Sequence, residues 1–481
     1  MVNFSVMIGF FIYLAGMLFL GIYLAKFNKT NEDFLLGGRK LSSWVLALSE
    51  RASGESAWLL LGMTGAAMTV GFGEIWTALG CILGILFSWF FIAGPLRGAV
   101  GVSESLTIPD YFSEKFDDGG FSVRLISTLV IILAYFFYVA AQFNGAGKVL
   151  NVTFGIPQFW GIVIGASVII LYTMLGGFFA VAWTDVVQGI IMFLTLIILP
   201  IIGFIEIAQS NANILAPMQE AGQHLTSFLS GKTGWAAIAF VLGGLSWGFG
   251  YMGQPHLLIR FLALKNEKEA KKGRIVAAAW TIPAFIGAFL IGIVGIGLHG
   301  STTFLDDPEK LLPTLAIDLL PLLIAGIFIS GAIAAMMSTA DSQLIVMTSS
   351  LTEDIMTKLL NMKLSQKQLV MWSRVFTVIL GAASFIFAVF AKELVFNIVS
   401  YAWSILGAGM GPVILLSLYW KKLTKAGVLT SLITGTLATL IWKNVAALEG
   451  IISHRFAAFI ISITLTIIVS ILTSKKSKVE A

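Results

Sequence analysis

The chain has 481 residues, of which 58% are hydrophobic and only 11% are charged. This composition excludes an ordinary water-soluble protein, and the net charge of +5 comes with no nucleic-acid-binding motif. A single cysteine, Cys81, excludes an intramolecular disulfide and a cysteine-based metal site.

Apolar segments long enough to cross a bilayer as helices, about 20 residues each, recur along the whole chain. We expect thirteen spans, centred on residues 4–25, 45–70, 75–96, 122–147, 157–177, 181–207, 235–260, 275–298, 320–350, 371–391, 395–419, 426–444 and 453–473. The expected fold is therefore an all-α polytopic membrane protein with a single transmembrane domain over residues 1–481. An odd number of spans places the two termini on opposite sides of the membrane.

Positive charge is unevenly divided between the two sets of loops. One set is rich in Lys and Arg and comprises residues 26–40, 97–124, 260–274, 358–374, 421–425 and 475–478. The opposite set holds only Lys148, Lys232, Lys310, Lys392, Lys443 and Arg455. Because cytoplasmic loops carry the excess of Lys and Arg, we expect the N-terminus outside and the C-terminus in the cytoplasm.

The second span carries Glu50, Arg51 and Glu55 in an otherwise apolar segment that is rich in Gly, Ser and Ala. Charges are costly inside a membrane and mark functional sites, and small residues favour a broken helix whose freed carbonyls can bind an ion. Arg51 and Glu55 are four residues apart, so they can pair on an intact helix. The pair would act as a conformational lock or as part of a solute site; alternatively, these charges face a water-filled cytoplasmic cavity.

The seventh span holds a second interrupted segment, residues 243–256, which contains five glycines and Pro255. Two interrupted spans at corresponding positions indicate inverted repeats. The repeats would cover residues 45–208 and 235–420, with residues 1–44 before them and 421–481 after them. The alternative is that the glycines only allow close helix packing.

The ninth span places Ser338, Thr339, Asp341 and Ser342 within about one helical turn. Ser338, Asp341 and Ser342 share one helical face, and oxygen ligands suit a hard cation. The alternative is that the hydroxyls bond to carbonyls of their own helix.

Several segments together resemble the sodium/solute symporters, and most closely their bacterial proline-transporting branch. They are Asp33–Arg39, Leu106–Phe112, Gly176–Asp185, Trp247–His256, Ala334–Thr339 and Val399–Trp403. The resemblance implies a leucine-transporter-like fold with a 5+5 inverted-repeat core, and sodium-driven import by alternating access.

The resemblance also implies particular sites. Sodium would be bound by the carbonyls of Ala52, Glu55 and Ala335 and the hydroxyls of Ser338 and Thr339. A second site, for a cation or a proton, would use Asp185, Ser338, Asp341 and Ser342, unless Asp185 only caps a helix end. The solute pocket would be lined by Trp58, Tyr138, Trp247, Tyr251, Gln254 and Pro255, although an aromatic stripe by itself is more typical of helix packing.

Two cytoplasmic residues, Arg39 and Asp110, match family motifs and are expected to make gate contacts. The chain also departs from the family, because Gly54 stands where the proline-transporting members carry an Asp that is important for sodium. Glu55 is one position further along and would be the alternative source of that carboxylate.

The sequence thus predicts a sodium-coupled symporter of the inner or plasma membrane, with Na⁺ as coupling ion and L-proline as the leading solute. The alternatives are another amino acid, a monocarboxylate or a vitamin, with Arg51 holding a carboxylate, or a transporter-like nutrient sensor. No nucleophile–base pair or metal motif indicates an enzyme. No nucleic acid or obligate protein partner is inferred.

Overall fold

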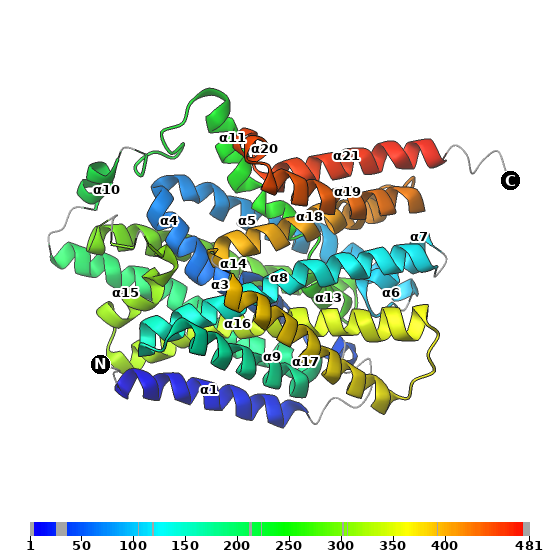
Figure 1. Ribbon diagram of the computed structural model, residues 1–481, viewed down its shortest axis with the longest axis horizontal. Coiled ribbons are helices and arrows are strands. Elements are labelled where there is room, and N and C mark those ends of the chain that lie inside the picture. The colour runs from blue at the N-terminus through cyan, green and yellow to red at the C-terminus, as the bar shows by residue number, and fades with distance from the viewer. Residues whose placement is uncertain are drawn as a thin grey trace.

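The computed structural model describes residues 4–25, 36–103, 105–117, 120–210, 214–222, 224–300, 303–304, 306–391 and 393–474 (Figure 1). Residues 26–35, Lys392 and residues 475–481, which include Asp33 and part of the predicted positive charge, lie outside this set. The described residues form helices and connecting turns without a strand.

The first half of the chain contains α1 to α10. Their bounds, with those of the short 3-10 and π-helical elements η1 to η4, are α1 Phe4–Ala25, η1 Gly37–Arg39, α3 Ser43–Ala57, η2 Trp58–Met63, α4 Thr64–Val70, η3 Gly71–Glu74, α5 Ile75–Phe87, η4 Ser88–Ile92, α6 Ala93–Ser103, α7 Ile108–Phe116, α8 Phe121–Phe154, α9 Gln158–Gln209 and α10 Leu215–Ala221.

The second half contains α11 to α21. Their bounds, with those of η5 and η6, are α11 Gly234–Leu245, α12 Trp247–Gly250, α13 Pro255–Leu262, α14 Glu267–His299, η5 Pro308–Lys310, α15 Leu311–Leu319, α16 Leu322–Ser349, η6 Ser350–Leu359, α17 Gln366–Phe390, α18 Val395–Tyr419, α19 Lys425–Asn444, α20 Ala446–Ile451 and α21 His454–Ser474.

Among the described residues, ten helices are long and apolar enough to cross a membrane, or eleven if the bent α11–α13 segment counts as one span. One of them, Ser43–Gly101, has 59 residues and would be about 88 Å long as a straight helix, which is enough for two crossings. It is divided at Gly71, whose φ of 68° lies in the left-handed region. The shorter apolar helix Gln158–Met174 is separated from the span Gly177–Gln209 by a kink at Gly177, φ 63°. Counting these segments separately gives the thirteen predicted spans.

The long helices lie side by side along one direction, and α1 begins at the end of the bundle opposite to the one where α21 finishes (Figure 1). The Lys- and Arg-rich turns between α6 and α8, α16 and α17, and α18 and α19 lie at the latter end. In the apolar stretch of α18, 89% of the residues are buried, whereas the figures for α1 and α17 are 33% and 28%. Helix α18 therefore lies in the interior of the bundle, and α1 and α17 lie at its periphery. The interrupted α3 contacts α9, α13, α14 and α16, so it is part of the core around which the site is built.

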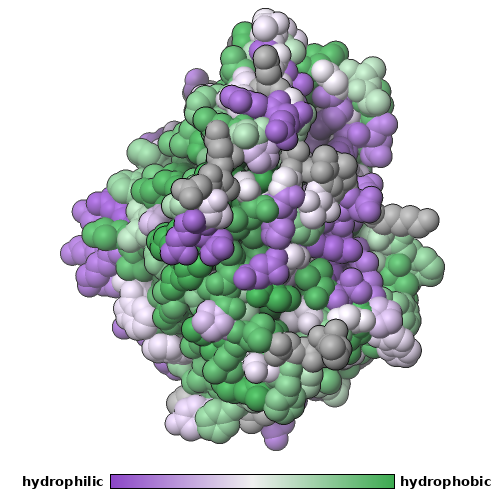
Figure 2. Space-filling model, turned by 90° about the vertical axis from the view of Figure 1, so that its left-hand side faces the viewer, coloured by the Kyte–Doolittle hydropathy of each residue, from purple (hydrophilic) through white to green (hydrophobic). Residues whose placement is uncertain are grey.

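The face at which α1 begins has hydrophilic side chains spread across it among hydrophobic ones (Figure 2). The flanks of the bundle expose large apolar side chains, such as Phe19 on α1, Ile190 on α9 and Phe390 on α17. Apolar flanks together with partly polar ends are what a bilayer requires of a helical bundle.

Candidate functional site

Helix α3 is broken at Ser56, where the sequence predicts an interruption. Ser56 has a φ of 41° and a ψ of −169°, far from helical values. Side chains stabilise the break: the backbone N–H of Ala57 donates to Gln142 Oε1 at 3.0 Å, and that of Trp58 donates to Ser56 Oγ at 3.2 Å. Because the helical ladder stops here, carbonyls of the last turn are free to meet other groups.

The corresponding segment of the second repeat is also broken. Helices α11–α12 and α13 meet at an angle of 44°, across the turn that precedes Pro255. Gln254 takes the N-cap position of α13, and its Nε2 donates to the carbonyl of Trp403 at 3.2 Å. The glycines have a packing role too: a Cβ added at Gly248 would lie 2.5 Å from the carbonyl oxygen of Gly80. Both interpretations of this segment, interruption and close packing, therefore apply.

Most of the predicted sodium ligands converge between α3 and α16. Ser338 Oγ donates to the carbonyl of Ala52 at 2.9 Å and to that of Ala335 at 3.1 Å. Thr339 Oγ1 donates to the carbonyl of Ser53 at 2.8 Å. All five residues are buried, and the atoms that converge are all oxygens, which is the chemistry a hard cation prefers.

The Glu55 carbonyl is the exception among the predicted ligands. It accepts the backbone N–H of Trp58, while Thr339 meets the Ser53 carbonyl, two residues earlier. The reason is the position of the break, since the carbonyls that face α16 lie one turn before it.

The predicted second cation site contains the guanidinium of Arg260, a residue that the sequence had assigned to a positive cytoplasmic loop. That assignment is wrong, because Arg260 on α13 is only 1% exposed. The guanidinium donates to Ser49 Oγ at 3.1 Å, Ser53 Oγ at 2.8 Å, Asp185 Oδ2 at 3.0 Å and Ser342 Oγ at 2.6 Å. The Arg260 guanidinium thus bonds to Asp185 and Ser342, two of the four residues expected to bind a free cation.

Two carboxylates face this one guanidinium. Asp341 Oδ1 accepts from Ser342 Oγ at 3.2 Å, and within the described part of the chain Asp185 Oδ1 and Asp341 Oδ2 have no hydrogen-bond partner. If both carboxyl groups are ionised, one negative charge is left without a partner in a buried region. Asp185 lies inside the helical segment Gly177–Gln209, so its interpretation as a helix-end cap is wrong.

Four of the six predicted solute-pocket residues, Trp58, Tyr138, Trp247 and Tyr251, form one buried aromatic cluster with Trp403, whereas Gln254 and Pro255 lie at the start of α13. Trp58 stacks on Trp247 with ring centroids 4.6 Å apart and an interplanar angle of 13°. Trp403 lies edge-on to Tyr251 at 4.7 Å and to Tyr138 at 6.3 Å. The Trp403 Nε1–H donates to the carbonyl of Trp247 at 3.0 Å. Aromatic faces with polar edges suit a small apolar ring that carries charged groups.

Arg51 lies between two carboxylates beside this cluster. Its Nη1 donates to Glu55 Oε1 at 2.6 Å, which is the pair expected from the spacing, and its Nε donates to Glu50 Oε2 at 2.6 Å. Trp89 Nε1 also donates to Glu50 Oε2, at 2.8 Å, and Tyr251 OH donates to Glu55 Oε2 at 3.2 Å.

The three charged residues Glu50, Arg51 and Glu55 are each 1% exposed or less. The alternative of a water-filled cavity around them is therefore wrong for this conformation. Glu55 directs its carboxylate at Arg51 and Tyr251 and not at α16, so it does not replace the carboxylate that is missing at Gly54.

A second buried charge network joins α7, α8 and η6 at the Lys- and Arg-rich end. Arg124 Nη1 donates to Asp110 Oδ1 at 2.7 Å and to Asp354 Oδ1 at 3.2 Å. Thr107 Oγ1 donates to both carboxylate oxygens of Asp354, at 2.8 and 3.0 Å. The predicted gate residue Asp110 is thus one of several that link these elements. Arg39, the other, lies in η1 with a φ of 53°, and its gate role stays a prediction.

Comparison with known proteins gives the family. The family model described as the sodium:solute symporter family matches residues 34–435. The chain belongs to this sodium:solute symporter family. Relatives include the high-affinity proline transporter PutP of Bacillus subtilis (strain 168), 35% identical over 464 residues, which are 96% of this chain and 97% of that protein. The sodium/proline symporter of Escherichia coli (strain K12) is 36% identical over 444 residues, 91% of this chain and 88% of that one.

The fold of this symporter is shared with solved transporters. A Na⁺-coupled sialic acid symporter in a substrate-bound outward-open state matches with a TM-score of 0.81 at 21% identity over 98% of both chains. MhsT in complex with L-phenylalanine matches with a TM-score of 0.56 at 16% identity over 89% of this chain and 98% of that chain. The expected leucine-transporter-like fold is therefore confirmed, and with the family the prediction that the protein is a transporter rather than an enzyme. The exact repeat boundaries stay a prediction.

The sequence did not assign a site role to several residues that the symporter builds into these networks. They are Ser49, Ser53, Ser56, Trp89, Arg124, Arg260, Asp354 and Trp403. One signal was available for Arg260: it follows Pro255 closely in an otherwise apolar helix, where a charge is costly. For Ser49, Ser53, Trp89, Asp354 and Trp403, the partners lie far away in the sequence.

Proposed function

We propose that this member of the family imports L-proline together with sodium across the cell membrane, by alternating access. The observation that carries the proposal is the all-oxygen cluster between broken α3 and α16, which joins Ser338 to Ala52 and Thr339 to Ser53. Such a cluster fits sodium, because it offers carbonyl and hydroxyl oxygens and no nitrogen or sulfur.

Sodium at this cluster would couple the two repeats, since α3 belongs to the first and α16 to the second. A bound ion would stabilise the arrangement in which the Ala52 carbonyl and the Ser338 hydroxyl remain close. A ligand can shift a conformational equilibrium only by its differential affinity for the two states. The ion would thus favour the state in which the solute pocket is complete.

For the solute, the aromatic cluster supports a compact molecule with one apolar ring. Trp58, Tyr138 and Tyr251 are buried and surround the break of α3, and the Glu55 carboxylate is hydrogen-bonded to Tyr251. A ring such as pyrrolidine would contact the aromatic faces, while its ammonium and carboxylate groups would meet Glu55 and polar edges. The names of the relatives, proline transporters and sodium/proline symporters, support proline in particular.

The direction of insertion follows from the distribution of positive charge. The turns rich in Lys and Arg gather at the end of the bundle where α21 finishes, and α1 begins at the other end (Figure 1). We therefore place the N-terminus outside and the C-terminus in the cytoplasm. The partners of the protein would be sodium, a small solute and the lipid bilayer.

The experiment is uptake of labelled L-proline into proteoliposomes with an imposed sodium gradient, compared with potassium and with a proton gradient. Accumulation that needs sodium and is blocked by excess unlabelled proline would support both ion and solute. Sodium-driven uptake of another amino acid, a monocarboxylate or a vitamin would keep the class and change the solute. Binding without net flux would support the nutrient-sensor alternative instead.

A further inference from the structure

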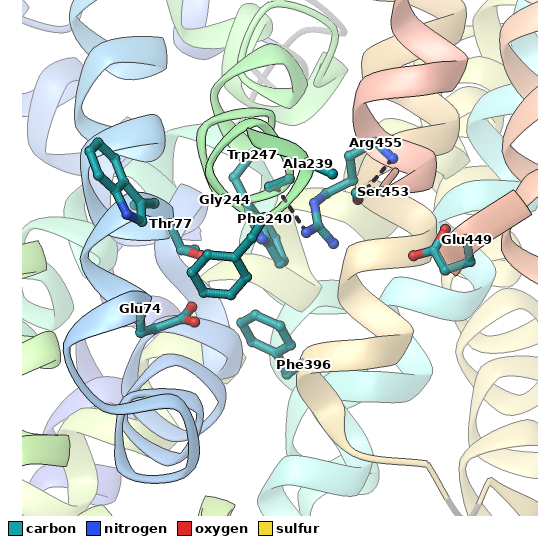
Figure 3. Close-up of a pocket in the computed structure, with 13 residues that line it drawn as sticks. Glu74, Thr77, Ala239, Phe240, Gly244, Trp247, Phe396, Glu449, Ser453 and Arg455 are labelled. Carbon is teal, nitrogen blue, oxygen red and sulfur yellow. Dashed lines mark hydrogen bonds between the residues drawn. The ribbon is translucent and has the colours of Figure 1, made fainter. Parts of the chain in front are cut away.

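Two cavities lie at the two ends of α21, a helix of 21 residues that is therefore about 30 Å long. The cavity at its first turn, of about 220 Å³, is lined by charges of both signs, which include Glu74 and Arg455 (Figure 3). The cavity at its last turn has a volume of about 650 Å³ and lies against the turn between α18 and α19. Within the described part of the chain, lysines line this second cavity and no carboxylate does. Its charge therefore favours an anionic ligand.

The positive charge of the second cavity comes from three lysines. Lys425 Nζ forms an ion pair with Asp117 Oδ1, so its charge is already balanced. Lys421 and Lys422 are exposed, and among the described residues neither has a carboxylate partner. Two ammonium groups that are next to each other in the sequence and open to one cavity match a phosphate group.

The first turn of α19 lines the same cavity and is held in place by hydroxyl groups. Thr424 Oγ1 accepts the backbone N–H of Gly427 at 3.2 Å and lies 2.7 Å from Thr473 Oγ1 of α21. The backbone N–H groups of Lys425 and Ala426, the first two residues of α19, have no carbonyl of an earlier turn to bond to. The positive end of the helix dipole therefore adds to the charge of the lysines.

An apolar strip begins at this cavity and follows the flank of the bundle. Leu429 lines the cavity, and the exposed side chains of Ile433, Leu437 and Ile441 follow it along α19 at intervals of four residues. Side chains at this interval are neighbours on a helix surface. A phosphate ion alone would leave this strip uncovered, whereas the acyl chain of a lipid would cover it.

Aromatic residues mark the level of the cavity in the membrane. Tyr419 and Trp420 directly precede Lys421, and Tyr419 is 56% exposed, with its hydroxyl donating to the carbonyl of Phe91. Trp and Tyr are enriched where the hydrocarbon core meets the head groups. Lys421 and Lys422 are therefore at the level of the lipid phosphates. The proposed orientation places this end in the cytoplasmic leaflet, which contains anionic lipids.

We propose that this cavity binds the head group of an anionic phospholipid of the cytoplasmic leaflet, with Lys421 and Lys422 on the phosphate and an acyl chain along Leu429. The site depends on the proposed orientation and not on the solute that is transported. The lipid would contact both the α18–α19 turn and the last turn of α21, which are far apart in the sequence. A ligand that binds only the folded protein stabilises it, so the bound lipid should raise the thermal midpoint.

The test uses the full-length protein purified in detergent, with dioleoylphosphatidylglycerol as the probe. The wild type should retain this lipid in native mass spectrometry, and added lipid should raise its thermal midpoint. Replacing Lys421 and Lys422 together with Gln should weaken lipid binding about tenfold or more, because each lysine near the head group adds to the attraction. Replacing both with Arg keeps the charges and should preserve binding. Lys268→Gln with Lys271→Gln is the matched control: it removes two exposed lysines from the first turns of α14 and should leave binding unchanged.

Two further ligands separate a lipid site from other sources of stabilisation. Dioleoylphosphatidylcholine has no net charge and sn-glycerol 3-phosphate has no acyl chains, so each should raise the thermal midpoint of the wild type much less. Equal effects of the two phospholipids, or a rise with phosphatidylglycerol that the Gln variant retains, would overturn the site. An effect of glycerol phosphate as large as that of phosphatidylglycerol would overturn the lipid and indicate a soluble phosphate ligand. After removal of co-purified lipid, equal midpoints of the wild type and the Gln variant would exclude a folding defect as the cause of lost binding.

Discussion

Arg260 on α13 and Asp185 on α9 form a buried ion pair, with Nη2 and Oδ2 3.0 Å apart. The pair links the second repeat to the first at the same level as the candidate sodium ligands, because Arg260 also donates to Ser53 Oγ. The Arg260 guanidinium is therefore a permanent positive charge beside the oxygen cluster that is suited to a sodium ion. The two aspartates in contact with this region should therefore respond differently to substitution.

Asp185→Asn should reduce sodium-driven uptake more than tenfold, because it leaves the Arg260 guanidinium buried and without its counter-charge; breaking such a pair costs about 3–5 kcal/mol. Asp341→Asn should retain most uptake, since the Arg260 guanidinium keeps its Asp185 counter-charge and the amide oxygen can still accept from Ser342 Oγ. Initial rates of labelled solute uptake in proteoliposomes measure both. Equal loss in the two variants would show that Asp341 is ionised and takes part in cation binding.

Replacing Ser338 and Thr339 together with Ala should raise the sodium concentration for half-maximal uptake about tenfold or more. Each hydroxyl removed takes away one candidate ligand, worth roughly 1.5–3 kcal/mol when the partner is charged. Ser330→Ala is the matched control on α16, because that hydroxyl bonds to the carbonyl of Gly326 in its own helix at 2.8 Å. A sodium dependence that the double variant leaves unaltered would rule out these ligands.

Arg51→Gln should destabilise the protein more than removal of the whole charged group does. The single change leaves the carboxylates of Glu50 and Glu55 buried without their partner, at a cost of about 3–5 kcal/mol. The triple variant Glu50→Gln, Arg51→Gln, Glu55→Gln has no such unpaired charge and should recover much of the loss. Thermal midpoints of the purified wild type, single variant and triple variant in detergent measure the coupling between Arg51 and the two glutamates.

An exchange of charge between Arg51 and Glu55 should fail to restore stability. Glu50 accepts from the Arg51 Nε, so a glutamate at position 51 would face a like charge. Recovery by the exchanged double variant would contradict the three-residue arrangement and favour a simple two-residue pair.

Arg124→Gln should lower steady-state accumulation and raise the external sodium requirement several-fold. The change leaves Asp110 and Asp354 as buried like charges, which favours opening at that end and shifts the population away from the sodium-binding state. Solute exchange across the membrane should persist. Lys358→Gln is the control, because Lys358 is 42% exposed and 4.0 Å from Asp110, and it should behave as wild type.

Asp117, which lies between α7 and α8, should contribute stability that depends on pH. Partial burial opposes ionisation of its carboxyl, but hydrogen bonds from Lys425, the Val123 N–H and Ser122 outweigh it and lower the pKa of Asp117 below its usual range. A carboxyl with a lowered pKa stabilises the folded state above its unfolded pKa, about 3.9, and this contribution is lost as the pH falls further. Asp117→Asn should thus lower the thermal midpoint more at pH 7 than near pH 3. The same effect at both values would mean that the carboxylate charge is not the cause.

The sequence by itself determined the class of protein, the spans and the interrupted segments, because these depend on local properties. Apolar length predicts a crossing wherever it occurs, and the Gly- and Ser-rich stretch around Ser56 predicts a break without knowledge of its neighbours. The pair between Arg51 and Glu55 was also local, since helical spacing brings residues four apart together. The shared face of Ser338, Asp341 and Ser342 was predictable in the same way, because residues at i, i+3 and i+4 lie on one side of a helix.

Only the tertiary structure decided which of these groups meet across helices. Ser53 and Ser338 are 285 residues apart in sequence, yet the Ser53 hydroxyl donates to the Ser338 carbonyl at 3.1 Å. The basic residues that follow Arg260 in the sequence are typical of a loop, whereas packing of α13 against α3 buries Arg260 among oxygens of three other helices. Glu74, the last residue of η3, and Arg455 on α21 likewise line one cavity only because α5, which follows η3, and α21 both pack against α11 and α12. Local periodicity carries no record of such contacts, because they depend on the angle and register at which helices pack.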